Sequence, residues 1–384
     1  MKKNLKQLLV LMTVFALALT LFTGCKKEAA EESSAIVIEA EESTVVKKEE
    51  SSQAPQESSQ APVQESSKEE SSAPEKKDGL INDPNMNPLT GEILDHPVAD
   101  KRPVCFTINN HPDAVPAVGI SHADIIYEGI IEGGATRMLA VFQELPDDIV
   151  IGSIRSLRHN YIEFAACYDA IIGHCGCSER ASDMLYQYDY DDIDAISYEG
   201  SLYYRDGWRD ANMGYVHSLV TTGEAINEYL ADEPFRTKHN SDYKCNMSFS
   251  ENPVVSGGEL MPTVDVFFGE YRHTIFTFDA ATNDYTAEEY DEPYIDYETS
   301  EPVRFKNLLV IKADVWEFDG VHQDMALTGE GEGYFCVNGV AAPIKWTRDD
   351  FLGQFTFTYA DGTPVVFGVG TTYIGVVNLD GGIS

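Results

Sequence analysis

Short apolar runs alternate with helix-like segments in the first half of the chain. Three apolar runs have the length and composition of buried strands, at residues 103–108, 123–131 and 138–143. Three further segments have the apolar spacing of helices, at residues 160–168, 178–186 and 222–230. The last of these should begin at the capping box T-x-x-E at residues 221–224. The mixture predicts a mixed-sheet α/β domain, which we place at residues 79–240.

The pattern changes to strand-like alternation after Met261. Apolar positions recur every second residue at Val264, Val266 and Phe268, and a further buried run covers residues 308–311. Two hairpin turns are indicated by Asn338-Gly339 and Asp361-Gly362. We therefore expect a β-rich C-terminal domain at residues 241–384, with the boundary in the polar segment 238–258 and an α+β class for the whole chain.

The N-terminus has the pattern of an export signal. Lys2, Lys3 and Lys6 precede an uncharged stretch at residues 8–22, followed by Thr23, Gly24 and Cys25. The stretch is shorter than the roughly 20 residues of a membrane-spanning helix, and it resembles a lipobox, in which the new N-terminal cysteine carries the acyl chains. This predicts lipidation at Cys25 and a protein anchored to the extracytoplasmic face of the membrane. An ordinary secreted protein or an uncleaved anchor is the alternative.

Composition adds a spacer and excludes one class of partner. Residues 26–78 repeat Ser, Glu, Gln, Ala and Pro, with ESSQAP present twice, and hold too little apolar surface to fold. The chain has 27 Lys and Arg against 64 Asp and Glu, a formal net charge of −37. Such a charge opposes a phosphate backbone, so nucleic acid is excluded as a partner.

Six cysteines remain after Cys25, and no C-x-x-C motif occurs among them. The chain is too long to need disulfide staples, so we expect free and mostly buried thiols. His174, Cys175 and Cys177 offer thiolate and imidazole ligands, which leaves a metal site as the alternative. Our assignment includes no metal and no cofactor.

Arginine is used selectively in the first domain. Between residues 102 and 237 there is no lysine, whereas arginine occurs at positions 102, 137, 155, 158, 180, 205, 209 and 236. Arginine is preferred where a planar cation must bind a carboxylate or phosphate in a fixed geometry. Glu132 and Arg137 lie in EGGATR, and Arg155 and Arg158 lie three apart in IRSLRHNY, on one face if this segment opens a helix. The pattern favours either an anion-binding cleft or internal ion pairs with the many acidic residues.

The segment HCGCS, from His174 to Ser178, lies between an apolar run and a helical pattern. It should form a strand-to-helix turn with Ser178 as the helix cap, and such a turn attracts anions. Cys177 with His174 or His217 could instead act as a nucleophile, because a helix N-terminus lowers the pKa of a thiol. His111 and His217 are either site residues or structural histidines.

Several of these segments together resemble one protein family. NPLTGE at residues 87–92, RPVCFTINNHP at 102–112, EGGATR, IRSLR, the His174 turn and HSLVT at 217–221 are similar to the YerB-like lipoproteins of Gram-positive bacteria. The resemblance implies lipid anchoring, an α/β first domain and a β-rich second domain, but it supplies no reaction. Cys175, Cys177 and Val220 depart from the family pattern, which weakens an argument for thiol chemistry.

Two functional hypotheses of different class follow. The first is a non-catalytic lipoprotein that binds an anionic cell-envelope ligand, such as a wall carboxylate, a polymer phosphate or a partner protein. Its cleft would be formed by Glu132, Arg137, Arg155, Arg158, His174, Ser178 and His217. The second is a cell-wall hydrolase or transferase that uses Glu128 or Glu132 with His174 as acid and base. We favour the first, because no residue spacing demands a catalytic pair, and we assign no catalytic residue.

Overall fold

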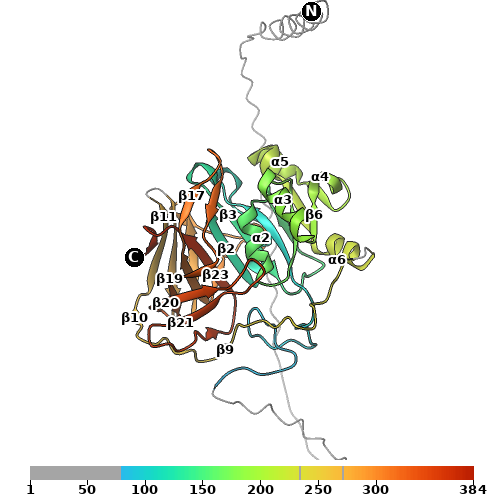
Figure 1. The fold of residues 1–384 in the computed structure, drawn as a ribbon. Helices are drawn as coiled ribbons and strands as arrows, with labels where there is room; N and C mark the ends of the chain where they lie inside the picture. Colours follow the sequence, from blue (N-terminus) through green and yellow to red (C-terminus); the bar gives the residue numbers. More distant parts are fainter. Residues whose placement is uncertain (1–78, 233–234, 270–271) are drawn as a thin grey trace, which may run out of the picture. The chain divides into compact units, whose positions relative to one another are not determined.

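A computed structural model describes residues 79–232, 235–269 and 272–384, which lie in one compact unit (Figure 1). The signal peptide, Cys25 and the spacer predicted at residues 26–78 lie outside the described residues. Within the described part of the chain, no helix has both the length and the apolar character needed to cross a membrane.

A large mixed sheet runs through this unit. Buried apolar residues fill both of its faces, as expected of a sheet covered on two sides. In order across the sheet, the strands are β10 (Glu259–Leu260), β20 (Val340–Arg348), β19 (Gly329–Val337), β16 (Asn307–Lys312), β23 (Thr372–Val377), β2 (Ile125–Ile130), β3 (Thr136–Phe142), β1 (Val104–Asn109), β5 (Ile171–His174) and β6 (Asp192–Asp194), with β21 (Thr356–Tyr359) on β20.

Strands from the two predicted domains meet inside this sheet. β23, near the C-terminus, pairs in parallel with β2, with Ile125 opposite Thr372 and Gly129 opposite Val376. Both hydrophobic clusters contain residues from before and after residue 240. The fold is α+β with a mixed sheet and a β-rich C-terminal region, but its two parts share one sheet and one core.

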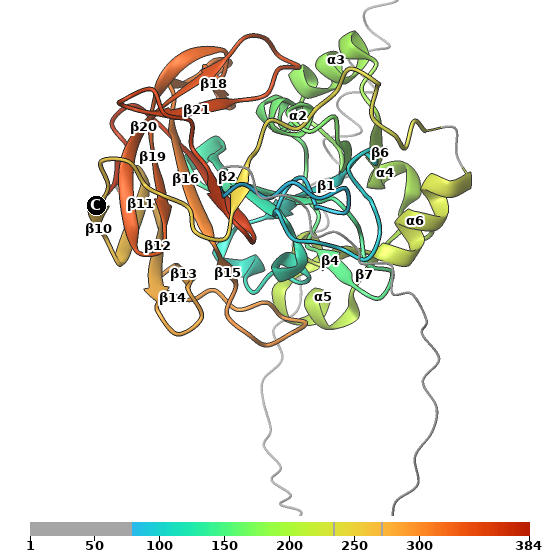
Figure 2. The same cartoon turned by 90° about the horizontal axis from the view of Figure 1, so that it is seen from below.

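Helices cover one face of the N-terminal part of the sheet. α2 (His159–Ala166) and α3 (Glu179–Tyr188) pack there through residues such as Phe164 and Ala181, beside the hairpin of β17 (Val315–Glu317) and β18 (Gln323–Met325). The short parallel pair of β9 (Phe249–Ser250) and β22 (Phe367–Gly368) contributes to the same cluster. Figure 2 shows α2 on one side of β1, with β4, β7 and α5 on the other.

Two smaller sheets cover the opposite face. The first is built around the alternation predicted after Met261, and its strands are β14 (Glu292–Pro293), β13 (Asp284–Glu289), β12 (Arg272–Asp279), β11 (Thr263–Gly269) and β24 (Gly382–Ile383), with β15 (Arg304–Phe305) on β13. The second holds β4 (Val150–Gly152), β8 (Leu219–Thr222) and β7 (Tyr203–Arg205). Helices α4 (Ala195–Tyr198), α5 (Gly207–Met213) and α6 (Gly223–Asp232) follow or separate these strands.

Several local expectations can be compared with the structure. Thr222, not Thr221, caps α6, because its Oγ1 accepts from the N–H of Ala225 at 3.2 Å. Arg155 and Arg158 share no helical face, because α2 begins only at His159. Asn338-Gly339 forms the predicted tight turn between β19 and β20.

The other predicted hairpin is irregular, and the thiols are free. After Asp361-Gly362 the pairing with β21 is reduced to an isolated bridge at Thr358 and Pro364, because proline has no N–H for a ladder. All six described cysteines are free, as expected, but only Cys105, Cys167 and Cys336 are buried; Cys175 and Cys245 are partly buried, and Cys177 is exposed.

Candidate functional site

The loops at one edge of the main sheet carry most of the predicted site residues. β1 runs parallel to β5, and the antiparallel β3 lies between β1 and β2, so the carboxyl ends of β1, β2 and β5 point to the same edge. His111 follows β1, Glu132 follows β2, and His174 ends β5. In sheets of this kind, ligands bind at the carboxyl ends of parallel strands.

Glu132 and Arg158 form a two-pronged ion pair at this edge. Nε of Arg158 donates to Oε2 of Glu132 at 3.0 Å, and its Nη2 donates to Oε1. Burial would raise the pKa of Glu132, but the hydrogen bonds and the charge of Arg158 lower it to about 2. Glu132 is therefore a carboxylate at neutral pH, and its charge is balanced by Arg158.

Arg137 is a buried cation without a carboxylate partner. It lies near the start of β3, and its side chain is almost fully buried. Nη1 donates to the carbonyl oxygen of Ser156, whereas Nε has no hydrogen-bond partner among the described residues. Burial, assisted by the charge of Arg158, lowers the pKa of Arg137 to about 10, so the group is still charged at neutral pH.

Arg155 is a second cation without a carboxylate partner, and it is more exposed than Arg137. It is half-buried, and Nη1 makes one long contact of 3.4 Å to the carbonyl oxygen of Val216. Its Nε also has no partner among the described residues, and burial lowers the pKa of the guanidinium. No carboxylate of the described chain lies within ion-pair distance of Arg137 or Arg155. Neither cation is therefore neutralised by an ion pair within the described chain.

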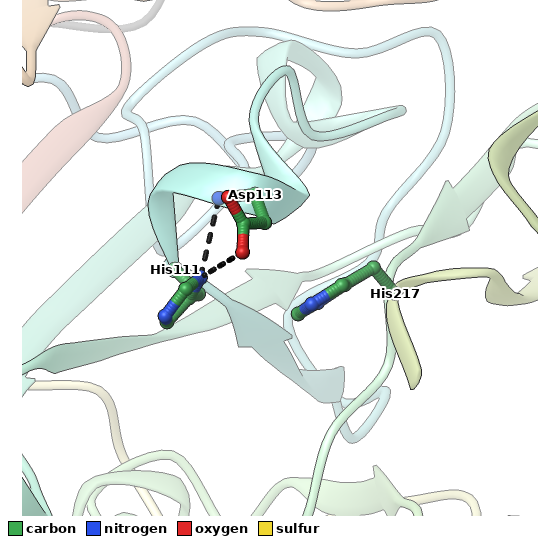
Figure 3. A group of neighbouring side chains, drawn as sticks. All are labelled: His111, Asp113 and His217. Carbon is green, nitrogen blue, oxygen red and sulfur yellow. Dashed lines mark hydrogen bonds and ion pairs between the residues drawn. The ribbon is translucent and has the colours of Figure 1, made fainter. Parts of the chain in front are cut away.

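Two histidines and an aspartate lie beside Arg155. His217, in the turn η4 (Tyr215–His217), stacks on His111 with ring centroids 5.6 Å apart, and Asp113 lies in η1 (Pro112–Ala114) within 3.6 Å of His111 (Figure 3). Burial, then the charge of Arg155, lowers the pKa of His217. His217 is therefore neutral at pH 7.

Backbone and amide contacts determine the tautomer of His217. The N–H of His111 donates to Oδ1 of Asn109 at 3.2 Å, so the Asn109 amide turns its Nδ2 toward Nδ1 of His217 at 2.8 Å. Nδ1 of His111 likewise faces the N–H of Asp113 at 3.2 Å. In neutral His217 the proton therefore sits on Nε2, which is a donor, whereas Nδ1 of His111 also lies 3.6 Å from Oδ2 of Asp113.

His111, Asp113 and His217 could also offer ligand atoms to a metal ion, since their possible ligand atoms lie within 4.8 Å of one another. A metal at Nε2 of His217 would require the proton on Nδ1, where the ring faces the amide of Asn109 instead. The positive charges of Arg155 and Arg209 act on His217 as well. The donor set and the charge fit an anion better than a cation.

Arg209 holds the histidine loops in place. Its guanidinium is almost fully buried and donates to three backbone carbonyl oxygens. Nε donates to the carbonyl oxygen of His217 at 3.0 Å, and the two Nη groups donate to the carbonyl oxygens of Pro116 and Ala114 at 2.8 Å. These bonds join η4 to the loop that carries His111 and Asp113.

His174 and Ser178 have local structural partners. His174 is buried, with Nε2 at 3.1 Å from Oδ2 of Asp192 and Nδ1 at 3.0 Å from the carbonyl oxygen of Gly176. Ser178 is the predicted cap of α3 and accepts from the N–H of Ala181 at 3.4 Å. The turn adjoins the arginines through its backbone, since Cys175 N–H donates to the carbonyl oxygen of Arg155.

The residues of the catalytic alternative are held by other groups. Glu128 is fully buried in β2, with Asn110, Thr136, Thr274, Tyr373 and Arg272 as partners. The pKa of Cys177 is raised, by burial and by the charge of Asp194, which is opposite to the expectation for a nucleophile at a helix N-terminus.

A cavity of about 350 Å³ opens next to His111. It is lined by His111, Pro112, Ile130, Gly133, Gly134, Ala135, Phe268, Gly269, Arg272 and Tyr290. Arg137, Arg155, Arg158 and His217 do not line the cavity, but His111, which does, stacks on His217, and Gly133 and Gly134 follow Glu132 in the chain. The sequence analysis did not assign Asn109, Asp113, Arg209 or the residues of β11 and β12 to the site. Of these, Asn109 had a local signal, because it lies in the segment NNHP.

Comparison with known proteins places the chain in a family. Two models of a family described as "Protein of unknown function (DUF3048)" match the chain, the N-terminal domain at residues 89–236 and the C-terminal domain at residues 264–374. The chain belongs to the DUF3048 family.

One DUF3048 relative is YerB of Bacillus subtilis (strain 168), whose name marks it as a candidate lipoprotein. It is 27% identical over 294 residues, which cover 76% of this chain and 85% of YerB. The crystal structure of YerB from Bacillus subtilis matches with a TM-score of 0.67 and 27% identity, covering 78% of this chain and 99% of that one. The predicted family resemblance is confirmed, and the fold is that of YerB.

Proposed function

We propose that this protein is a lipid-anchored, extracytoplasmic binding protein that holds an anionic group of the cell envelope in the cleft of Arg137, Arg155 and His217. The ligand is a polymer or a protein that presents a phosphate or a carboxylate. Glu132 and Arg158 form one wall of this cleft, and the turn of His174 and Ser178 supports Arg155 from behind through its backbone.

One observation carries the proposal. In a chain of net charge −37, Arg137 and Arg155 have no carboxylate partner among the described residues. Each also has a buried Nε without an acceptor. A buried polar group without a partner is costly, by about 1–3 kcal/mol, and an anion would supply the missing acceptors. Neutral His217 adds an N–H donor without further charge.

Anchoring at the membrane rests on the sequence and on the relative. The lipobox places Cys25 at the expected cleavage point, and YerB is named a candidate lipoprotein. Changing Cys25 to Ser should move the protein from the membrane fraction to the soluble or medium fraction. A C25S protein that still sediments with membranes would contradict lipid anchoring.

Anion binding is tested by calorimetric titration of the purified protein with inorganic phosphate and with acetate. The variant Arg155→Lys keeps the charge but loses the planar fork, and we expect it to bind at least tenfold more weakly. Arg155→Met should abolish binding. Arg304→Lys is the matched control, because Arg304 lies near Asp279 on another sheet.

The melting temperature separates a binding role from a structural one. A binding arginine without protein partners should leave the melting temperature of Arg155→Lys nearly unchanged. A large drop in that temperature, with unchanged titration curves for both anions, would show that Arg155 serves the fold and would overturn the proposal.

A further inference from the structure

The cavity beside His111 indicates what kind of anion the cleft receives. Its walls are mostly carbon, from Pro112, Ile130, Ala135, Phe268 and Tyr290. Its volume of about 350 Å³ falls at the lower end of the range for small-molecule sites, roughly 300–1,000 Å³. It can therefore hold one ring-sized group next to the anion.

Among the described residues that line the cavity, Arg272 is the one arginine, and most of its N–H groups are bound within the fold. Nε of Arg272 donates to Thr136 at 2.8 Å, Nη1 donates to the carbonyl oxygen of His273, and Nη2 binds Glu128 and Glu289. Its guanidinium also lies 4.7 Å from the centre of the Tyr290 ring. These bonds use four of its five N–H groups, and the two carboxyl groups balance its charge, so a group that enters the cavity needs no negative charge to pair with Arg272.

The ring of Tyr290 is held in place at this wall. Its hydroxyl donates to the carbonyl oxygen of Asn110, and Arg272 packs against one side of the ring. A fixed aromatic face of this kind suits a flat, partly apolar group such as the C–H face of a sugar. On the opposite rim, a Cβ at Gly133 or Gly134 would meet no described atom within 4 Å, so the entrance is open there.

A peptide is a poorer fit to the same cavity. Extended peptides bind by adding a strand to a free sheet edge. The strands β2, β11 and β12 border the cavity, and each has a neighbouring strand on both sides over much of its length. Only their ends, at Ile130, Gly269 and Arg272, extend past one of these pairings, which leaves a short edge for a peptide.

We infer that the ligand is an anionic saccharide, with a pyranose ring in the His111–Tyr290 cavity and its phosphate or carboxylate at Arg155 and His217. The inference rests on the proposed function, because Arg155 must bind the anion. His111 lines the cavity and stacks on His217 with ring centroids 5.6 Å apart, so the cavity and His217 lie on either side of one imidazole ring.

The test compares ligands that carry an anionic group, a sugar ring, both or, as a contrast, a dipeptide. The protein is titrated with inorganic phosphate, N-acetylglucosamine 1-phosphate, N-acetylmuramic acid, neutral N-acetylglucosamine and the dipeptide D-alanyl-D-alanine. We expect one or both anionic sugars to bind at least tenfold tighter than inorganic phosphate or the neutral sugar. Which of the two sugars binds tighter tells a phosphate source from a carboxylate source.

Variants at Tyr290 test whether the sugar ring binds in the cavity. Tyr290 has φ +55°, a conformation that Asn tolerates, so Tyr290→Asn removes the ring with little backbone strain. It should reduce the affinity for the anionic sugar to that for phosphate and leave phosphate binding unchanged. Tyr290→Phe keeps the ring and should keep the affinity for the sugar.

The outcomes distinguish this inference from the proposed function. If phosphate binds but neither anionic sugar binds tighter, or if Tyr290→Asn leaves sugar affinity unchanged, the saccharide assignment is wrong and the anion cleft stands. Tighter binding of the dipeptide than of the sugars would also overturn it. If none of the anions binds, the proposed function itself fails.

Discussion

Asn109 donates its side-chain amide to Nδ1 of His217 at 2.8 Å, and this one bond fixes the proton of His217 on Nε2. The amide cannot turn over, because its Oδ1 accepts from the backbone N–H of His111. A residue at the end of β1 thereby sets the tautomer of a residue more than one hundred positions later. His217 is kept neutral by burial and by Arg155, and the Asn109 amide makes Nε2 its donor.

Changing Asn109 to Asp should reverse the protonation of His217. A carboxylate beside Nδ1 favours the charged imidazolium, so the pKa of His217 should rise from below its ordinary value to above it. NMR titration of the His217 ring resonances measures this shift directly. In the wild-type protein the lowered pKa of His217 contributes stability above about pH 6.5, and this contribution is lost as the pH falls through the folded pKa. In N109D the raised pKa should instead contribute stability at low pH, which is lost as the pH rises.

The control for this experiment is Asn109→Leu, which removes the donor without adding a charge. It should leave the pKa of His217 low, because burial and Arg155 still act on the ring. An equal rise of that pKa in both variants would show that loss of the amide, and not the added carboxylate charge, raises it.

Replacement of Arg209 should loosen the histidine loops. Arg209→Met leaves three carbonyl oxygens without their donor, and we expect the free energy of unfolding to fall by about 2–4 kcal/mol in denaturant titrations. Affinity for phosphate should fall as well, since His111 and His217 lose their common support. Arg205→Met, which breaks a partly exposed pair with Glu199, should cost about 1 kcal/mol or less. Equal losses in the two variants would contradict this role for Arg209.

Local signals in the sequence were sufficient for the elements but not for their assembly. The apolar run at residues 103–108 becomes β1, and the turn at Asn338-Gly339 joins β19 to β20, because each depends on neighbouring residues. The insertion of β23 beside β2 joins segments about 250 residues apart, and no short motif specifies that pairing.

The arginines of the candidate site show the same limit of what the sequence can predict. The absence of lysine indicated that the arginines had fixed roles, but residue types alone do not tell which cation has a partner. Glu132 reaches Arg158 and not Arg137 because of the turn geometry after β2. Glu128 was a candidate acid on the sequence, yet Arg272 from β12 neutralises it inside the fold.

Glu289 should make the stability of the protein depend on pH. Burial, and the nearby charge of Glu128, raise the pKa of Glu289 well above that of a free carboxyl group, and both carboxylates share Arg272. A raised folded pKa means that the stabilising contribution is complete below the unfolded pKa, about 4.3, and is lost as the pH rises through the folded pKa. The wild-type protein should therefore lose stability through this group from about pH 4.3 upward.

Glu289→Gln mimics the protonated form and tests this directly. Its amide can still accept from Arg272 and can donate to Thr274, which also binds Glu128. Denaturant unfolding at several pH values should show the variant gaining stability over the wild-type protein as the pH rises. A constant difference between the two proteins from pH 5 to pH 8 would exclude a titrating Glu289.

The segment 79–240 should not fold without residues 241–384. Without β23, the backbone of β2 loses its parallel partner along five residue pairs. Glu128 would keep Asn110 and Thr136 but lose Arg272, Thr274 and Tyr373, and breaking a buried ion pair costs about 3–5 kcal/mol. The N–H groups of Gly119 and Ser121 would lose Asp296. These losses approach the whole stability of a typical domain, about 5–15 kcal/mol.

We therefore expect residues 79–240 alone to give a poorly dispersed amide NMR spectrum and a thermal transition without cooperativity. Adding residues 241–384 as a separate chain should restore dispersion, because the missing strand and Arg272 return together. Glu128→Gln in residues 79–240 is the informative variant: it removes the buried charge but not the open edge of β2, so it should recover only part of the order. A sharp, cooperative transition in the unmodified segment would show that the two parts of the shared sheet are independent folding units.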